Sequence, residues 1–282
     1  MSSPATPTHG QATDVRIAEV VAACKRYGGS SIIALAGVPG TGKSHIGRIA
    51  AQRVAGDPLR VREVQFHQST TYEEFVEGLR IDASGAIVQE PGLFLEWNDL
   101  ALDNPELKWV LLIEELSRAN VSAVLGELMT FVEDRNRPFT ATYSRRPIRV
   151  APNLVLLATY NPSDRSALDI DNALLRRLRV INFPADSGQL ADMLAAQLPA
   201  NVMTRLSGLF SSIEQQHPDD FQDLMPFGHG IFAEVRQESP DLHELWRERI
   251  RHMLRRPLVQ PHPFTDAIEA AYPWRDPEYA EP

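Results

Sequence analysis

Cysteine is nearly missing from the 282-residue sequence, in which Cys24 is the one example. A single thiol excludes an intrachain disulfide framework and is far short of a structural zinc site, so we expect a reduced setting. Long apolar runs are missing too, because no stretch approaches the ~18 apolar residues of a membrane span. Residues 1–13 have neither a basic start nor an apolar core, which favours a flexible leader over a signal peptide. Together these absences predict a cytoplasmic protein.

Positive charge is also scarce, with 28 lysines and arginines against 37 aspartates and glutamates and a net charge of -9. This balance excludes a surface that is basic throughout, so any nucleic-acid contact would come from a local patch, an assembled pore or a partner. The hydrophobic content of 43% is ordinary for a globular protein, and the length suits one large α/β domain with a smaller one.

The most informative stretch is residues 37–44, Gly-Val-Pro-Gly-Thr-Gly-Lys-Ser, which fits the phosphate-binding pattern G-x-x-x-x-G-K-[ST]. An apolar run at residues 31–36 precedes it and a helical pattern at residues 45–54 follows, as this loop requires. Glycines let backbone N–H groups converge on phosphate oxygens, while Lys43 would neutralise the β- and γ-phosphates and Ser44 would hold Mg²⁺. The candidate nucleotide-binding residues are Gly37, Val38, Pro39, Gly40, Thr41, Gly42, Lys43, Ser44 and His45.

Two carboxylates follow a second apolar run, residues 109–113, which is typical of a buried strand. Open α/β sheets bind ligands at the carboxyl ends of their strands, where Glu114 and Glu115 would lie. Glu114 would hold Mg²⁺ through water, and Glu115 would orient and polarise the attacking water for hydrolysis. A strand that merely stops at solvated glutamates is the alternative, and the phosphate loop upstream favours the catalytic interpretation.

Two further polar features come later in the chain. Asn161 comes shortly after an apolar strand at residues 153–158 and would reach the γ-phosphate and its attacking water, although an ordinary Asn-Pro turn explains it equally well locally. A helix at residues 167–178 ends in Arg176 and Arg177, which the helix dipole alone would favour. As arginine fingers, they would reach a neighbouring subunit's nucleotide, and the active unit would be an oligomer.

The chain order predicts a flexible leader at 1–13, an α/β nucleotide-binding domain at 14–186 and a helical lid domain at 187–256. Residues 257–282 are rich in proline and aromatics, which favours an extended tail that packs either on the body of the protein or on a partner. A hairpin expected at residues 137–150 carries Arg145, Arg146 and Arg149, a cluster that is usually a solvated face.

The order of phosphate loop, carboxylate-ended strand, asparagine-ended strand, arginine-ended helix and helical lid resembles an AAA+ ring NTPase. The finer matches are similar to its McrB-like branch, the motor subunits of modification-dependent restriction systems, without the DNA-reading domain that such subunits join to the motor. The resemblance covers most of residues 30–256. It is carried by FHQSTTYEEFVEGLR at 66–80, LLIEELSRANVSAVLGELMTFVED at 111–134, LLATYNPSDRSALDIDNALLRRL at 156–178 and PFGHGIF at 226–232.

This resemblance implies an α/β P-loop fold, a parallel sheet flanked by helices with a smaller C-terminal helical lid, and a hexameric ring that uses Mg²⁺ with ATP or GTP. It assigns catalysis to Glu115, the first sensor to Asn161 and trans-acting roles to Arg176 or Arg177. Asp164 is a further catalytic candidate, because with Arg165 it lies in a stretch similar to the family signature N-T-A-D-R-S. The chain departs from that signature at Pro162 and Ser163, and Glu114 stands where most AAA+ proteins have Asp.

The leading hypothesis is therefore an oligomeric NTPase that drives conformational work on a partner, such as an McrC-like nuclease on a separate chain, in restriction or phage defence. Any contact with DNA is expected to be indirect. Two alternatives remain open at this point. One is a MoxR-like chaperone that activates a protein partner, favoured by the acidic balance, and the other is a nucleotide-gated scaffold with little hydrolysis.

Overall fold

The computed structural model describes residues 11–162, 172–194, 198–216, 225–234, 242–254, 264–272 and 274. Contacts between residues divide the chain into two compact units. The sheet unit comprises Ile17–Ala36 and Lys43–Ile181, and the helical unit comprises Met1–Arg16, Gly37–Gly42 and Asn182–Pro282. The phosphate loop is thus divided after Gly42, so that its first six residues group with the helical unit.

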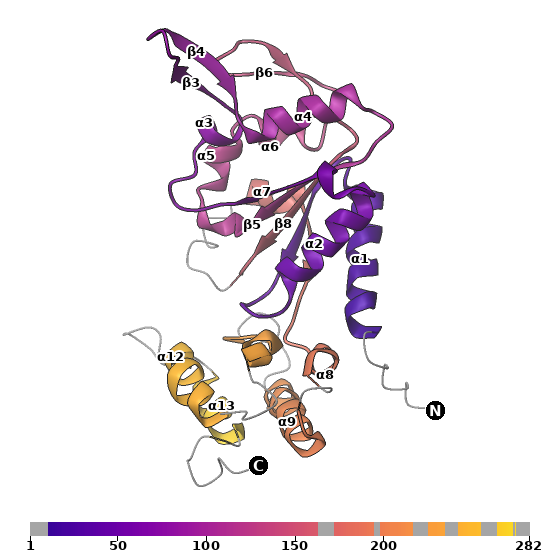
Figure 1. Cartoon of the computed structure of the whole chain (residues 1–282), viewed down its shortest axis with the longest axis vertical. Helices are drawn as coiled ribbons and strands as arrows, with labels where there is room; N and C mark the ends of the chain where they lie inside the picture. The colour runs from indigo at the N-terminus through magenta and orange to yellow at the C-terminus, as the bar shows by residue number, and fades with distance from the viewer. Residues whose placement is uncertain are drawn as a thin grey trace. The chain divides into compact units, whose positions relative to one another are not determined.

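The sheet unit is built on a five-stranded sheet in the order β2-β5-β8-β1-β9. Figure 1 labels β5 and β8 of this sheet. The strands are β2 (Val61–Gln65), β5 (Trp109–Glu114), β8 (Leu154–Tyr160), β1 (Ile32–Ala36) and β9 (Leu178–Asn182). β2 with β5, β5 with β8 and β8 with β1 pair in parallel. β1, β5 and β8 are buried along their whole length, because parallel sheets of this kind are flanked by helices.

Helices and two hairpins complete the sheet unit. The helices are α1 (Gln11–Tyr27), whose first turns belong to the helical unit, α2 (Lys43–Ala55), α3 (Tyr72–Phe75), α4 (Leu93–Asp103), α5 (Val121–Leu125), α6 (Leu128–Phe131) and α7 (Asn172–Arg177). The hairpins are β3 (Glu77–Ile81) with β4 (Ile87–Pro91), and β6 (Phe139–Thr140) with β7 (Pro147–Ile148). α2 packs on β5 and β8, and this placement brings its first residues to the strand ends.

The local sequence pattern correctly predicts the start of α3 but does not predict the interruption of the helix that follows β5. Thr71 and Glu74 form the capping box that their spacing predicts at the start of α3. The apolar spacing of residues 121–133 predicts one amphipathic helix, but the structure has two short helices, α5 and α6, with a break between them. Gly126 lies there at φ 50°, a left-handed conformation that favours glycine, and a Cβ on it would come within 2.9 Å of the Tyr72 ring.

The helical unit contains α8 (Ser187–Leu194), α9 (Ala200–Gln216), the 3₁₀ helix η4 (His229–Glu234), α11 (Leu242–Leu245), the π-helical turn η5 (Trp246–Ile250), α12 (Arg251–Leu254) and α13 (Thr265–Ala271). Phe210 of α9 packs edge-on against Phe227 and Phe232, which stand on either side of residues 228–231. All three rings are buried in the core of this unit.

The C-terminal segment differs from its prediction as an extended tail. Between its prolines the chain forms α13, and Phe264, Ile268, Tyr272 and Trp274 are buried in the core of the helical unit. The physical reason is the helical spacing of the first three of these residues, which gives the segment an apolar face to bury. Within the described residues, no helix has the length and apolarity needed to cross a membrane.

Candidate functional site

The register of the sheet brings the predicted polar residues to one edge. Ala36 at the end of β1 lies opposite Tyr160 near the end of β8, and Ile113 of β5 lies opposite Ala158 of β8. Glu114 is therefore level with Thr159, and Asn161 follows one residue beyond the end of β8. This edge holds the carboxyl ends of the strands, where α/β folds bind their ligands.

Residues 37–42 adopt a shape that depends on glycine. Gly40 and Gly42 have φ values of 81° and 82°, a backbone conformation that residues with a Cβ atom rarely adopt. The Thr41 side chain is fully buried, and its Oγ1 donates a 3.0 Å hydrogen bond to the Val38 carbonyl, which ties the loop to itself. Such a curled backbone can direct successive N–H groups toward an anion.

Ser44 and Glu114 meet directly in the sheet unit. The Ser44 hydroxyl donates to Glu114 Oε2 at 2.8 Å, and the Thr159 hydroxyl also contacts Glu114 Oε2. Glu114 is 5% exposed, and its Oε1 atom has no hydrogen-bond partner among the described residues. A buried carboxylate oxygen without a donor needs an explanation, and a bound cation provides one.

These atoms fit Mg²⁺. The ion takes oxygen ligands, and two of its neighbouring ligands lie about 3 Å apart because each is about 2.1 Å from the metal. The Ser44 hydroxyl lies 2.8 Å from Glu114 Oε2, which places it beside the same carboxylate whose Oε1 atom has no hydrogen-bond partner among the described residues and would face the ion. The Thr159 hydroxyl donates to the same carboxylate and helps to fix its position.

Glu115 has an unusual backbone. Its φ of 57° and ψ of 43° are left-handed, a conformation that costs a residue with a side chain about 1–2 kcal/mol and that is found preferentially at functional sites. Its N–H donates to Thr159 Oγ1 at 3.2 Å. Its carboxylate is about one-third exposed and accepts a 3.0 Å hydrogen bond from Arg118 Nε. Thr159 and Arg118 thus hold the residue from its two ends.

Sequence reasoning missed Thr159, Arg118 and the pair formed by Arg48 and Glu63. Arg48 donates to both oxygens of Glu63 at 2.6–3.1 Å, which raises the pKa of Arg48 and lowers the pKa of Glu63. Arg48 approaches Glu114 Oε1 only to 3.8 Å, beyond hydrogen-bonding distance. Its position one helical turn after Ser44 was the available signal, since residues four apart share a helix face.

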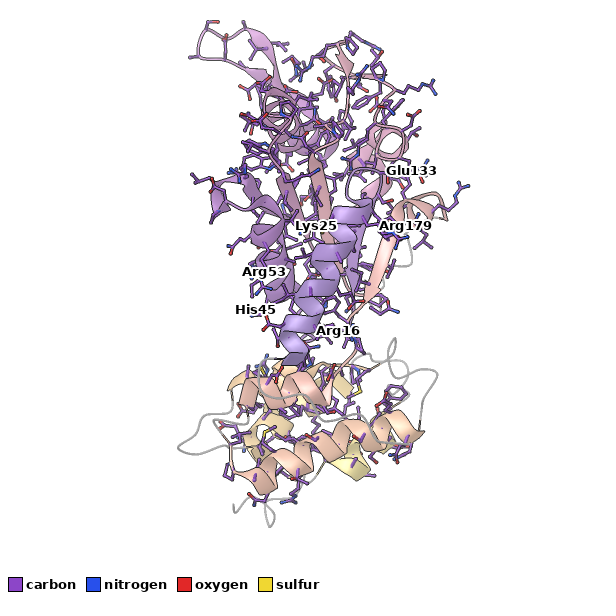
Figure 2. All side chains as sticks on the ribbon, turned by 90° about the vertical axis from the view of Figure 1, so that its right-hand side faces the viewer. Arg16, Lys25, His45, Arg53, Glu133 and Arg179 are labelled. Carbon is purple, nitrogen blue, oxygen red and sulfur yellow. The ribbon has the colours of Figure 1, made fainter. Side chains whose placement is uncertain are left out.

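The remaining predicted residues are not all brought together. Asn161 is buried at the strand ends, whereas His45 is exposed on α2 (Figure 2). Arg177 Nε lies 3.4 Å from Glu133, while Arg176 is exposed and has no hydrogen bond or ion pair with the described residues. Asp164 lies outside the described residues, as does Arg165.

Two curated restriction-enzyme proteins are similar in sequence to this chain. Over 159 residues the chain is 36% identical to the type IV methyl-directed restriction enzyme EcoKMcrB subunit of Escherichia coli strain K12, covering 53% of this chain and 34% of that protein. It is 26% identical over 184 residues to the type II restriction enzyme BsuMI component YdiS of Bacillus subtilis strain 168, covering 50% of this chain and 53% of that protein. The chain therefore spans about a third and about half of the lengths of these relatives.

Structural similarity is weaker. The solved structure of NtrX from Brucella abortus matches 71% of this chain and 47% of its own chain, with a TM-score of 0.44 and 13% identity. The AAA domain family, dynein-related subfamily, matches residues 32–178 and so covers just over half of the chain. That match includes the phosphate loop, both glutamates and Asn161, and the protein belongs to the AAA domain family, dynein-related subfamily.

Proposed function

We propose that this chain is a Mg²⁺-dependent hydrolase of ATP or GTP that works as the motor subunit of a McrB-like assembly. The observation that carries the proposal is the buried Glu114 carboxylate, which is held by Ser44 and Thr159 and keeps one oxygen without a hydrogen-bond donor among the described residues. The Ser44 hydroxyl follows the phosphate-loop lysine directly in the chain, and the Glu114 carboxylate lies beside it. Together these two groups would form a cation site beside a bound triphosphate.

Each side chain has a defined task in this reaction. A bound Mg²⁺ would supply neutralisation of the phosphate charge. Lys43 binds the same phosphate oxygens, and Ser44 with Glu114 provides the metal ligands. Glu115 accepts a hydrogen bond from the attacking water and orients it in line with the γ-phosphate. Arg118 holds the Glu115 carboxylate, so it would have to release that carboxylate as water is positioned.

Glu115→Gln tests this assignment because it keeps the shape of the side chain and removes its charge. We expect nucleotide affinity to stay within about twofold, and turnover to fall at least about hundredfold. Glu106→Gln is the control, because Glu106 is an exposed glutamate of the same unit. Purified protein would be assayed for phosphate release and for binding of fluorescent ATP and GTP. Unchanged turnover in Glu115→Gln would remove Glu115 from this role.

The same proposal includes a ring in which Arg176 completes the neighbouring subunit's site. Arg176 supports this role better than Arg177, because it is exposed and unpaired among the described residues while Arg177 lies against Glu133. An arginine supplied by a neighbour contributes about 10³-fold or more to turnover in related chemistry.

A mixing experiment tests whether the arginine acts between subunits. Arg176→Ala and Glu115→Gln should each be inactive alone, for different reasons. In a mixed oligomer, the Glu115→Gln subunit still supplies its arginine to a neighbour that has an intact Glu115, so activity should return. Mixtures that stay inactive although the subunits co-assemble, as shown by light scattering and cross-linking, would argue against an arginine acting in trans.

The relatives support a partner on another chain, because their names describe a subunit and a component of restriction enzymes. We therefore propose that hydrolysis drives conformational work on a nuclease-type, McrC-like partner, with DNA engaged indirectly. The net charge of -9 also favours a chaperone of the MoxR-like kind. Affinity capture from native extract distinguishes them, since a nuclease supports the first function and a metal-binding or von Willebrand-type partner supports the second.

A further inference from the structure

Residues 228–230 bind the phosphate loop through backbone atoms within the helical unit. The Gly228 N–H donates to the Pro39 carbonyl at 2.7 Å, and the Gly230 N–H donates to the Gly40 carbonyl at 2.6 Å. Both distances are short for bonds between backbone groups, whose usual N···O separation is about 2.9–3.0 Å. These contacts agree with the grouping of Gly37–Gly42 with the helical unit rather than with the sheet.

Glycine is needed at both positions because two backbones meet there. A Cβ on Gly228 would lie 2.5 Å from the carbonyl carbon and oxygen of Gly40 and from Cγ2 of Thr41. A Cβ on Gly230 would lie 2.8 Å from the same carbonyl oxygen. Backbone atoms cannot move aside as a flexible side chain can, so either methyl group would separate the segment from the loop.

The bonds act on the part of the loop that would receive phosphate. Because the Pro39 and Gly40 carbonyls are bound to residues 228–230, the orientation of the two peptide groups that contain them is restricted. Gly40, which lies between these two groups, has a φ of 81°. A phosphate-binding loop requires its N–H groups to converge, and an unsupported glycine-rich loop would lose conformational entropy on binding. Support before binding removes part of that cost.

The segment is itself firmly attached to the helical unit. Phe227 and Phe232 are both fully buried and pack on Phe210 of α9 at ring separations of 6.4 and 6.0 Å. His229 is also buried, and burial lowers its pKa to about 4, so it brings no positive charge to the loop at neutral pH. The contribution of this segment to the loop is therefore made by its backbone.

We propose that Gly228 and Gly230 form a clasp that positions the phosphate loop for the nucleotide and couples nucleotide occupancy to the helical unit. The proposal rests on the NTPase function proposed above and identifies two positioning residues for it. Displacement of residues 228–230 would break the two backbone hydrogen bonds, loosen the phosphate loop and release the nucleotide. Conversely, a bound triphosphate would favour the loop conformation in which these hydrogen bonds are made.

Alanine substitutions test the clasp against a matched control. Gly228→Ala and Gly230→Ala should each weaken triphosphate binding at least about tenfold, the effect of losing one or two backbone hydrogen bonds. Gly208→Ala lies in α9 with nothing within 4 Å of the added Cβ, and it should bind within about twofold of wild type. Affinity would be measured with fluorescent ATP and GTP well below each variant's unfolding temperature, so that a merely lower stability would not change it.

Hydrogen exchange on the unmodified protein tests the same idea without a variant that risks misfolding. Mg²⁺ and a non-hydrolysable triphosphate should slow amide exchange in the peptides covering 37–42 and 225–234 by similar factors. Slower exchange in the first peptide with no change in the second would overturn the clasp. If wild type binds no nucleotide at all, the proposed function fails first. If it binds and turns over while both clasp variants match Gly208→Ala, only the clasp fails.

Discussion

The two parts of the phosphate loop are held in different ways. Residues Gly37–Gly42 group with the helical unit and are held by backbone hydrogen bonds. Lys43 and Ser44 belong to the sheet unit, and Ser44 is held there through its side chain. In the first part, the added volume of a Cβ is what the structure does not tolerate. In the second part, the identity of one oxygen atom decides the contact, because Ser44 Oγ reaches Glu114. One short motif therefore combines two kinds of constraint, and substitutions in its two parts should fail in different ways.

The largest expected effect is on the side-chain part, from Glu114→Gln. This change keeps the volume and removes the charge that a divalent cation needs, so Mg²⁺-dependent turnover should fall at least about hundredfold. Nucleotide binding measured in EDTA should change by less than about twofold, because the loop backbone and Lys43 are untouched. Glu90→Gln, at an exposed position of the β3–β4 hairpin, is the control. Full activity in Glu114→Gln would contradict the metal role.

Thr159→Val should have the next largest effect. Valine has nearly the same shape, but Glu114 loses a donor and the Glu115 N–H loses its acceptor. We expect turnover to fall about ten- to hundredfold and the free energy of unfolding to fall by about 1–3 kcal/mol. The control is Thr204→Val, because Thr204 is exposed and its hydroxyl donates to the Ala200 carbonyl within α9. Equal turnover in the two variants would show that Thr159 positions neither glutamate.

Sequence reasoning reaches the side-chain part of the site more readily than the backbone part. Apolar runs predict β1, β5 and β8, and polar residues after them predict the functional edge, because parallel strands end together. The role of Thr159 is not predictable in this way, since threonine is an ordinary strand residue and only the register places it beside Glu114. The Arg48–Glu63 pair likewise requires knowing that α2 packs on β2.

The clasp shows a stricter limit. Gly228 and Gly230 are about 190 residues from the loop that they bind, and backbone hydrogen bonds leave no trace in residue type beyond the glycines themselves. α13 is a different case, because the spacing of Phe264, Ile268 and Tyr272 was a helical signal that the prolines around it obscured. Proline marks the ends of such a helix rather than excluding it.

The backbone-held part should also be sensitive to acid. The pKa of His229 is lowered to about 4 by burial, against an ordinary value of about 6.5, so the unfolded chain binds more protons between these two pH values. Stability should therefore fall as the pH drops below 6.5, by about 2 kcal/mol at pH 5 from this residue.

His229→Leu should remove that component. The difference in free energy of unfolding between pH 7 and pH 5, measured by urea denaturation, should be about 2 kcal/mol smaller in the variant than in wild type. Phe232→Leu is the control, because it perturbs the same core without a titratable group and should lower stability equally at both pH values. An unchanged pH difference in His229→Leu would mean that the imidazole can be protonated in the folded protein.

The smallest expected effect is on the Mg²⁺ concentration for half-maximal turnover. Removing the charge of Arg48 should lower this concentration, and removing the charge of Glu63 should raise it. Arg48 forms a close ion pair with Glu63 at 2.6 Å, and this pair keeps it 3.8 Å from Glu114 Oε1, beyond hydrogen-bonding distance. Arg48→Ala removes a positive charge that competes with Mg²⁺, so the Mg²⁺ concentration for half-maximal turnover should fall about twofold, a modest change because Arg48 is half exposed. Glu63→Gln frees Arg48 to pair with Glu114 and should raise the same concentration about twofold. Arg53→Ala, an exposed position on the same helix in Figure 2, should leave it unchanged. Shifts of the same sign in Arg48→Ala and Glu63→Gln would indicate a general weakening of the site, whereas opposite shifts require that Glu63 keeps Arg48 away from the metal-binding oxygen.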